Sequence, residues 1–283
     1  MFCAKSGSPR DPAPLTMPRE ITGFSNPLVK RVRGLREKKL RKREGLFLAE
    51  GLRILTEARD QGILPDMLFM ATDARPHPLA DSLVEAVESS GGDVILTSAD
   101  ILGKISGKDN AQTLVGVYPD RLTPLPALDR STASIWFVAQ AMRDPGNLGT
   151  LLRISDAVGA GGVILVDDCV DPFSVETVRA SMGAIFTQSI AQASWEDFLA
   201  WLRAGPGQLV GTSLNTEHDY QTPRYEASTF LLIGNEARGL PEDYEAACDL
   251  LVKIPMMGRA DSLNASVAGA VMAYEVLNQQ RRT

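Results

Sequence analysis

The sequence has few of the residues on which metal sites, disulfide frameworks and histidine catalysis depend. Its 283 residues include three cysteines and two histidines. Cys3, Cys169 and Cys248 are odd in number and widely spaced, which fits neither a disulfide framework nor a zinc-ligand pattern. The histidines are His77 and His218, and this scarcity disfavours both a histidine-based triad and a histidine-rich metal site. The sequence therefore predicts incidental thiols, no metal ion and no catalytic histidine.

Long hydrophobic runs are also missing. No apolar run approaches the roughly 20 residues that a transmembrane helix needs, and the N-terminal residues lack the apolar centre of a secretory signal. Glycine (24) and proline (17) follow no repeating period, which excludes collagen-like and low-complexity classes. With 44% hydrophobic and 23% charged residues, the composition is typical of a soluble globular protein of one or two domains. We expect a cytoplasmic protein without a membrane segment.

The net charge of −6 argues against a nucleic-acid partner, but the positive charge is unevenly distributed. Between Arg19 and Arg43, ten lysines and arginines face only Glu20 and Glu37 as acidic residues. A segment of this density can neutralise phosphates and release their counterions. A solvated helix face is the alternative interpretation. The ten residues are Arg19, Lys30, Arg31, Arg33, Arg36, Lys38, Lys39, Arg41, Lys42 and Arg43.

The chain is predicted to have four segments. Residues 1–18 are rich in proline, serine and alanine, which indicates a disordered tail. Residues 19–118 alternate short apolar runs with helical stretches, a pattern typical of an α/β module, and begin with a helix that runs from Asn26-Pro27 toward Arg43. Residues 119–133 are proline-rich and form the linker candidate. Residues 134–283 form a second, larger α/β domain.

The two α/β segments differ in the strength of their strand patterns. In the first, strands are predicted over 47–50, 66–70, 94–96 and 113–117, and helices over 52–59 and 79–88. In the second, strands are predicted over 135–139, 163–166, 209–212, 230–233 and 250–254, and helices over 148–158, 175–185, 195–203 and 266–279. The second set consists of near-continuous Val, Ile and Leu runs, which favour a parallel sheet covered on both faces. Ligands of such sheets bind beyond the carboxyl ends of the strands.

Polar residues gather in three of the loops that follow these strands. Asn147 is expected to cap a helix, and Arg153 lies six residues later, close enough to return to the same edge of the sheet. The polar residues of the three loops are Asn147, Arg153, Asn235, Glu236, Asp261, Ser262 and Asn264. Such a set can hydrogen-bond and orient a hydroxyl group, but it contains no ordinary pair of nucleophile and base.

Other enzyme classes fit these loops poorly. The run VGAGG at 158–162 follows a predicted helix and precedes a strand, which is the reverse of the order in a dinucleotide-binding turn. No Walker sequence is present, and Ser262 lacks the G-x-S-x-G elbow of a hydrolase nucleophile. From the residues alone, an unspecified α/β enzyme that acts on a small molecule stays open.

The three loops resemble the three sequence motifs of the SpoU/TrmH branch of the SPOUT RNA methyltransferases. DPGNLGTLLRISDA is similar to the first motif, LLIGNEARGLP to the second and IPMMGRADSLNASVAGAVMAYE to the third, and RASMGAIF at 179–186 also fits the family. Together they cover about 150 residues in the expected order. Residues from Asn26 to about Val117 resemble, more loosely, the small substrate-binding domain of the ribosomal-RNA members, which is similar to ribosomal protein L30e.

The resemblance implies a C-terminal α/β domain with a deep trefoil knot, an exception to the rule that chains do not thread loops. It implies S-adenosyl-L-methionine as cofactor, held in the knot by residues that match Thr212, Gly234, Ile254 and Leu263. The reaction implied is transfer of the methyl group to a ribose 2′-hydroxyl of RNA. The polar positions of the family site match Asn147, Arg153, Glu236, Ser262 and Asn264.

In the family, the residue that matches Arg153 assists deprotonation of the 2′-hydroxyl. Because a guanidinium almost never loses its proton, we expect Arg153 to stabilise the developing alkoxide and an adjacent phosphate instead. Glu236 is expected to orient Arg153 or Asn147. Ser262 and Asn264 are expected to hold the ribose or shape the third loop.

The partners implied are RNA and a second copy of the chain. The basic segment is interpreted as the RNA contact, through Lys30, Arg31, Arg33, Lys38, Lys39, Arg41 and Lys42, and ribosomal RNA is favoured over transfer RNA. A homodimer through the C-terminal domain is expected. The last helix carries apolar residues around much of its circumference, which a fully buried core helix would also explain; they are Val267, Val271, Met272, Tyr274 and Val276. A transfer-RNA methyltransferase, a base methyltransferase and an inactive RNA-binding protein of the same fold are the alternatives.

Overall fold

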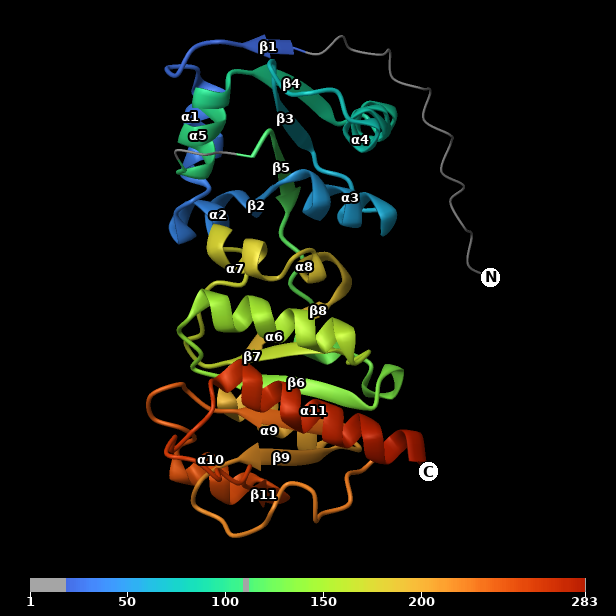
Figure 1. The fold of residues 1–283 in the computed structure, drawn as a ribbon, viewed down its shortest axis with the longest axis vertical. Helices are drawn as coiled ribbons and strands as arrows, with labels where there is room; N and C mark the ends of the chain where they lie inside the picture. Colours follow the sequence, from blue (N-terminus) through green and yellow to red (C-terminus); the bar gives the residue numbers. More distant parts are fainter. Residues whose placement is uncertain (1–18, 109–111, 283) are drawn as a thin grey trace, which may run out of the picture. The chain divides into compact units, whose positions relative to one another are not determined.

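The chain divides into two compact units, which are described separately. In this computed structural model, residues 19–108 and 112–282 are described (Figure 1). The first unit comprises the described residues up to Arg36 together with Leu48–Pro119, and the second comprises Glu37–Phe47 together with the described residues from Asp120 onward. The tail predicted over residues 1–18 lies outside the described residues.

The first unit is built on a five-stranded sheet with the order β1-β4-β3-β5-β2. The strands are β1 (Arg19–Ile21), β2 (Leu46–Glu50), β3 (Met67–Ala71), β4 (Asp93–Thr97) and β5 (Leu114–Pro119). The helices outside the basic segment are α3 (Leu52–Asp60), α4 (Pro78–Ser89) and α5 (Ala99–Ser106). The sheet is mixed, because β4 runs parallel to β1 and β3 whereas β5 runs antiparallel to β3. The four strands predicted here are confirmed, and the short edge strand β1 was not predicted.

The basic segment forms two helices, so the prediction of one helix running toward Arg43 was wrong. Asn26 caps α1 (Pro27–Gly34), since its Oδ1 accepts the N–H of Leu28 at 2.9 Å. After α1, the fully packed side chain of Leu35 interrupts the run of charges, and α2 (Lys38–Glu44) begins three residues later. α1 belongs to the first unit and α2 to the second. The segment breaks because its two halves pack on different units.

The second unit is built on a six-stranded sheet with the order β11-β9-β10-β6-β7-β8. The strands are β6 (Ile135–Gln140), β7 (Gly162–Val166), β8 (Ser189–Ala193), β9 (Gln208–Thr212), β10 (Thr229–Ile233) and β11 (Leu250–Val252). Each of the five pairings is parallel, as the apolar runs predict. β8 was not predicted, because Gln192 and Ser189 interrupt its apolar pattern. All carboxyl ends of these strands therefore meet at one edge.

Helices cover this sheet and connect its strands (Figure 1). They are α6 (Pro145–Ala157), α7 (Val175–Ala180), α8 (Ala184–Thr187), α9 (Trp195–Arg203), α10 (Glu242–Ala247) and α11 (Ala265–Arg282). The single helix predicted over 175–185 is divided into α7 and α8, because Met182 and Gly183 take left-handed backbone angles of φ 51° and 102°. α6 and α7 lie very close: a Cβ on Gly149 would come within 2.4 Å of the Cβ of Ala180.

The proline-rich stretch before β6 packs on the second unit. It contains the short helices η1 (Leu125–Ala127) and η2 (Arg130–Thr132). Leu125 and Leu128 are buried in the same core as Trp136, Phe198 and Phe230. The Arg130 guanidinium lies 4.0 Å from the centre of the Trp201 ring and donates to the carbonyl oxygen of Leu202. These residues therefore pack as a folded part of the second unit.

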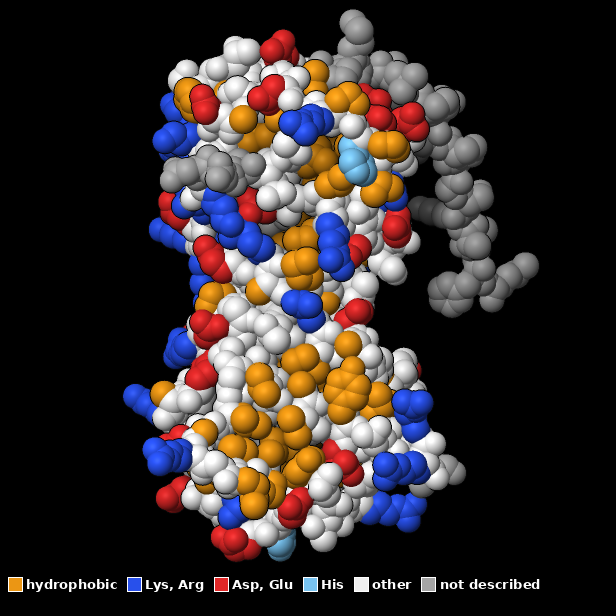
Figure 2. Space-filling view, viewed as in Figure 1, with side chains coloured by type: hydrophobic (Ala, Val, Ile, Leu, Met, Phe, Trp, Pro, Cys, Tyr) orange, Lys and Arg blue, Asp and Glu red, His pale blue; other side chains and the backbone are white. Residues whose placement is uncertain are grey.

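The last helix, α11, has one buried face and one exposed face. Met272 and Val276 are fully buried, whereas Val267 and Tyr274 are 45% and 48% exposed. The alternative of a fully buried core helix is therefore wrong. Hydrophobic side chains gather on the face of the second unit that carries α11 (Figure 2). Within residues 19–108 and 112–282, no helix is both long and apolar enough to cross a membrane.

Candidate functional site

A cleft lies at the carboxyl edge of the second sheet. Its volume is about 420 Å³, and the loops after β9, β10 and β11 line it. The four residues expected to hold a cofactor all line this one cleft: Thr212, Gly234, Ile254 and Leu263. The parallel sheet explains why they meet, since each follows or ends a strand at the same edge.

Gly234 is required by the backbone of the loop after β10. Asn235 and Gly239 exchange both backbone hydrogen bonds, at 3.2 and 2.9 Å, so the loop folds back on itself. A Cβ on Gly234 would lie 2.6 Å from the carbonyl carbon of Gly239. Any side chain at this position would therefore push the loop apart and reshape the cleft wall.

A chain of hydrogen bonds links the three loops. Asn147 donates from Nδ2 to Oε1 of Glu236 at 3.0 Å, and Asn264 donates from Nδ2 to Oδ1 of Asn147 at 2.8 Å. Oδ1 of Asn264 in turn accepts the N–H of Ser266 at 3.0 Å and so begins α11. The chain of hydrogen bonds thus joins three of the five predicted catalytic residues, one from the start of α6 and two from the loops after β10 and β11.

Asn147 was predicted to cap α6, and this prediction was wrong. The cap is Asp144, whose Oδ1 accepts the N–H of Asn147 at 2.7 Å. Asn147 is the third residue of the helix, so its side chain is free to bridge Glu236 and Asn264. Proline at the first helical position, Pro145, is consistent with a helix that begins there.

Glu236 is the anionic end of this chain. Burial raises its pKa, but hydrogen bonds from the Asn147 side chain and from the N–H groups of Arg143 and Asp144 outweigh that effect, so the net pKa is lowered. As a carboxylate it can only accept hydrogen bonds, which fixes the Asn147 amide with its oxygen toward Asn264. The contribution of Glu236 to stability is complete above its pKa in the unfolded chain and is lost as the pH falls through the lower folded-state pKa.

The remaining two predicted catalytic residues stand apart from the chain. Arg153 is exposed on the third turn of α6, and its guanidinium makes no hydrogen bond or ion pair with any residue that the structure describes. Glu236 therefore orients Asn147 and not Arg153. Ser262 lines the cleft, with its Oγ 3.5 Å from Oδ1 of Asp261. Both groups are available to a ligand.

Asn235 is a positioning residue that the sequence-based set of site residues did not include. Its Nδ2 donates to the carbonyl oxygen of Ala141 at 2.8 Å, which ties the loop after β10 to the loop after β6. Its Oδ1 accepts the N–H groups of Ala237 and Arg238. An asparagine two residues after a buried strand was the available signal. Among the described residues, no group of three or more His, Cys, Asp or Glu side chains could hold a metal ion.

The predicted RNA-binding residues fall on both units. Lys30, Arg31 and Arg33 are exposed on α1, and Lys38, Lys39 and Lys42 are exposed on α2. Arg41 differs, because its side chain is only 6% exposed and pairs with Asp171. Its Nε and Nη2 donate to the same carboxylate oxygen at 3.0 and 2.8 Å.

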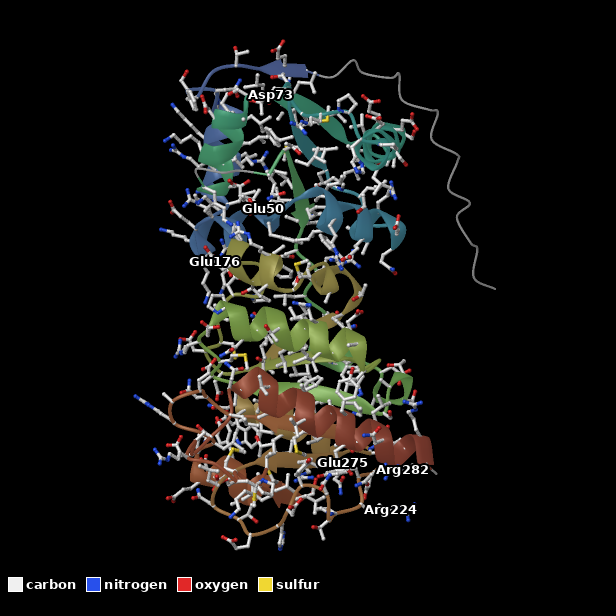
Figure 3. The ribbon with its side chains drawn as sticks, viewed as in Figure 1. Glu50, Asp73, Glu176, Arg224, Glu275 and Arg282 are labelled. Atoms are coloured by element: carbon white, nitrogen blue, oxygen red, sulfur yellow. The ribbon has the colours of Figure 1, made fainter. Side chains whose placement is uncertain are left out.

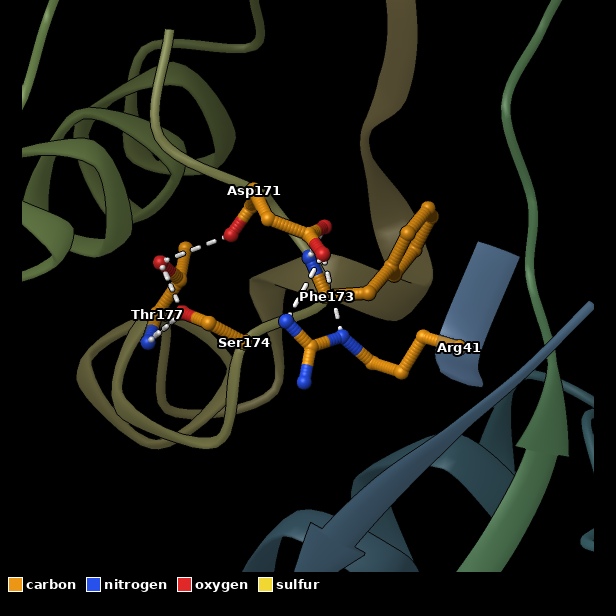
Figure 4. A network of polar contacts seen from close by, with 5 residues as sticks. All are labelled: Arg41, Asp171, Phe173, Ser174 and Thr177. Atoms are coloured by element: carbon orange, nitrogen blue, oxygen red, sulfur yellow. Dashed lines mark hydrogen bonds and ion pairs between the residues drawn. The ribbon is translucent and has the colours of Figure 1, made fainter. Parts of the chain in front are cut away.

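Asp171 belongs to a polar network at the start of α7 (Figure 4). Its other carboxylate oxygen accepts the N–H of Phe173, and its carbonyl oxygen accepts the hydroxyl of Thr177. Ser174 caps α7 by accepting the N–H of Thr177. Arg41 thereby anchors α2 to the loop after β7, and Lys38, Lys39 and Lys42 remain exposed.

The fold and site define a two-unit α/β protein with a ligand cleft at the end of a parallel sheet. The model of the SpoU rRNA Methylase family matches residues 134–274, and that of the MRM3-like substrate binding domain matches residues 26–116. The chain belongs to the SpoU rRNA methylase family and is a methyltransferase.

Relatives support this assignment along most of the chain. The 23S rRNA (guanosine(2553)-2′-O)-methyltransferase RlmP of Bacillus subtilis is 28% identical over 91% of this chain and 99% of its own length. The 23S rRNA (uridine(2479)-2′-O)-methyltransferase of Streptomyces viridochromogenes is 30% identical over 85% of each chain. The crystal structure of an AdoMet-bound rRNA methyltransferase from Sinorhizobium meliloti is 38% identical and covers 92% of this chain and 97% of its own, with a TM-score of 0.85.

Replacing Arg41 by alanine should destabilise the second unit by about 3 to 5 kcal/mol, because it leaves the Asp171 carboxylate unpaired at a site that is 12% exposed. Replacing the exposed neighbour Lys39 should cost less than about 0.5 kcal/mol. Denaturant unfolding of both variants measures the difference. Equal losses would contradict the anchoring role of Arg41.

Proposed function

We propose that this protein methylates a ribose 2′-hydroxyl of ribosomal RNA with S-adenosyl-L-methionine as methyl donor. The observation that carries the proposal is the hydrogen-bonded chain Glu236–Asn147–Asn264, which lies at the same sheet edge as the cleft lined by Thr212, Gly234, Ile254 and Leu263. The names of the relatives support ribosomal RNA as the substrate.

The cleft suits an adenosyl cofactor. Its volume of about 420 Å³ lies in the range of ligand sites. Gly234 keeps the wall free of a side chain, so that backbone groups can approach a flat base closely. Ile233, Ile254 and Leu263 supply apolar surface, and Ser262 and Asp261 supply polar groups. S-adenosyl-L-methionine supplies an electrophilic methyl group there.

The protein's own residues would orient and polarise the ribose hydroxyl. The Asn147 and Asn264 amides are held in fixed orientations by their hydrogen bonds, so these side chains do not have to reorganise when the substrate binds. Arg153 lies on the third turn of the same helix as Asn147, and no described residue pairs with its guanidinium, which suits it to an RNA phosphate and to negative charge that develops on the hydroxyl oxygen. Positioning supplies most of the rate, since effective molarities reach about 10⁵ M or more.

The second part of the proposal concerns assembly. We place a homodimer interface on the exposed face of α11, where Val267 and Tyr274 leave apolar surface open. The deep trefoil knot belongs to the same proposal, supported by the sheet order β11-β9-β10-β6 and by the family. The cytoplasm is the proposed location, because ribosomal RNA is the proposed substrate.

The reaction itself is tested with an Arg153→Ala variant. Mass spectrometry of ribosomal and transfer RNA from a deletion strain should reveal one missing ribose methyl group in ribosomal RNA. Wild-type protein should restore it, and Arg153→Ala should not, although its cofactor affinity should stay near wild type. Turnover within about tenfold of wild type, a loss below roughly 1.4 kcal/mol, would refute the role of Arg153. A methyl group missing from transfer RNA instead would make that the substrate.

The cofactor cleft is tested with two glycine variants. Gly234→Ala should weaken binding of S-adenosyl-L-methionine by more than about tenfold, because the new Cβ would collide with the Gly239 backbone. Gly258→Ala in the third loop should bind normally, since its Cβ would meet no atom within 4 Å. Calorimetry on the full chain measures both. Equal affinity in the two variants would place the cofactor elsewhere.

The RNA interaction is tested with the three exposed lysines of α2. Replacing Lys38, Lys39 and Lys42 by alanine should flatten the dependence of RNA affinity on salt, by roughly 0.7 to 0.9 in slope for each phosphate that the variant no longer neutralises. Arg41 is left intact because it anchors the helix. If the slope of log affinity against log salt did not change, these lysines would contact no phosphates and would form only a solvated helix face.

The dimer is tested by sedimentation of the full chain at working concentration. Wild-type protein should sediment as a dimer, and Tyr274→Glu should shift it toward a monomer of 30.6 kDa. A charge placed in an apolar interface loses its hydration without gaining a partner, which is the reason for the shift. A wild-type monomer with full activity would contradict the dimer.

A further inference from the structure

The second unit has another cleft beside the cofactor cleft. Its volume is about 540 Å³. The two clefts share Asn235, Arg238, Gly239 and Leu240, so the loop after β10 is a common wall. The other wall of this second cleft comes from the end of β6 and the residues after it, including Gln140 and Arg143.

Gln140 contributes a buried acceptor that nothing among the described residues uses. The residue is 6% exposed, and its Oε1 has no hydrogen-bond partner in the part of the chain that the structure describes. Buried polar atoms are nearly always paired, so an unpaired one calls for an explanation. A donor on a bound ligand would supply the missing partner.

The orientation of the Gln140 amide is set by its neighbours. Its Nε2 donates to Oδ2 of Asp167 at 3.1 Å, and the hydroxyl of Tyr244 donates to the same oxygen at 2.8 Å. Burial, followed by the hydrogen bond to Asp167, raises the pKa of Tyr244, so its hydroxyl keeps its proton. The Tyr244 ring stacks on Trp195 with 3.8 Å between centres. The hydrogen bond from Nε2 to Asp167 fixes which way the amide faces, and it leaves Oε1 as the amide atom without a partner among the described residues; the second N–H of Nε2 stays a donor.

Two guanidinium groups line the same cleft. The Arg238 side chain makes no hydrogen bond or ion pair with any described residue. Arg143 pairs with Asp168 at 2.6 Å, but the two side chains are 60% and 70% exposed. Such a surface pair is weak and can exchange for a stronger anion. The cleft therefore offers two positive charges for an anion and one buried acceptor for an N–H group.

We propose that this cleft binds a second nucleotide of the RNA substrate, next to the one that is methylated. Arg143 and Arg238 bind its phosphate, and Oε1 of Gln140 accepts a hydrogen bond from an N–H group of its base. An anion without an N–H donor would leave Gln140 unpaired, whereas a nucleotide has both parts. Gln140 is then a specificity-determining residue, because bases differ in where they carry N–H groups. This inference rests on the proposed function.

The hydrogen bond to the base is tested with a short synthetic RNA that contains the ribose methylated by the wild-type protein. Each base next to that ribose is replaced in turn, and KM and kcat are measured for wild type and Gln140→Met. Wild type should discriminate among bases at one position, and Gln140→Met should lose that discrimination with a KM about threefold to tenfold higher. Its affinity for S-adenosyl-L-methionine should not change, which distinguishes a missing hydrogen bond from a damaged fold.

A second RNA carries a methyl group on the base nitrogen whose N–H is proposed to donate to Gln140. This RNA should lower the activity of wild type toward that of Gln140→Met. It should have little further effect on the variant, because the methyl group and the substitution remove the same hydrogen bond. Additive losses, or a variant with wild-type base preference, would overturn the role of Gln140.

Binding of the phosphate is tested with an exposed residue, whose replacement leaves the core intact. Arg238→Gln should raise KM for the RNA and flatten its salt dependence by roughly 0.7 in slope. Arg224→Gln is the matched control: Arg224 is exposed on the same unit, near the C-terminal end of α11 (Figure 3), and should behave as wild type. Equal effects of the two variants would overturn the site. If wild type itself methylates no RNA, the proposed function fails; if it does and the variants match it, only this inference fails.

Discussion

The parallel order of the second sheet is the constraint on which the site depends. Because all five pairings are parallel, the loops after β6, β9, β10 and β11 end at one edge. Residues more than a hundred positions apart, such as Asn147 and Asn264, can then hydrogen-bond directly. The Glu236 carboxylate, which only accepts hydrogen bonds, fixes the orientation of the whole chain of amides.

The loop after β10 serves two clefts at once. Its backbone pairing between Asn235 and Gly239 makes it a rigid wall, and Gly234 lets it lie close to the rest of the chain. In the proposed function, one side faces the methyl donor and the other faces a neighbouring nucleotide. A single rigid element would then set the distance between the donor and the RNA backbone, which is what in-line transfer requires.

The distribution of charge reconciles an acidic protein with an anionic substrate. The positive charges that remain exposed on α2 sit on a helix anchored by Arg41 and Asp171, so their position on the second unit is defined and costs little entropy on binding. Arg153 adds positive charge on α6, and Arg143 and Arg238 add it in the loops after β6 and β10. The net charge of −6 is a sum over the whole chain, whereas the residues proposed to contact RNA are positively charged.

The local pattern of the sequence was enough to predict the α/β class, most strands and the three polar loops, because apolar periodicity and glycine or proline turns act over short distances. The residues expected to hold the cofactor came from the motif resemblance. The motif resemblance supplied the chemistry. Tertiary structure alone decided which side chains pair: Asp144 rather than Asn147 caps α6, Arg41 is buried against Asp171, and Gln140 is left with an acceptor that no described residue uses. It also decided that the basic segment breaks into two helices on different units. These outcomes depend on neighbours distant in sequence, which compete for the same hydrogen bonds and the same core space, and no local pattern encodes the result of that competition.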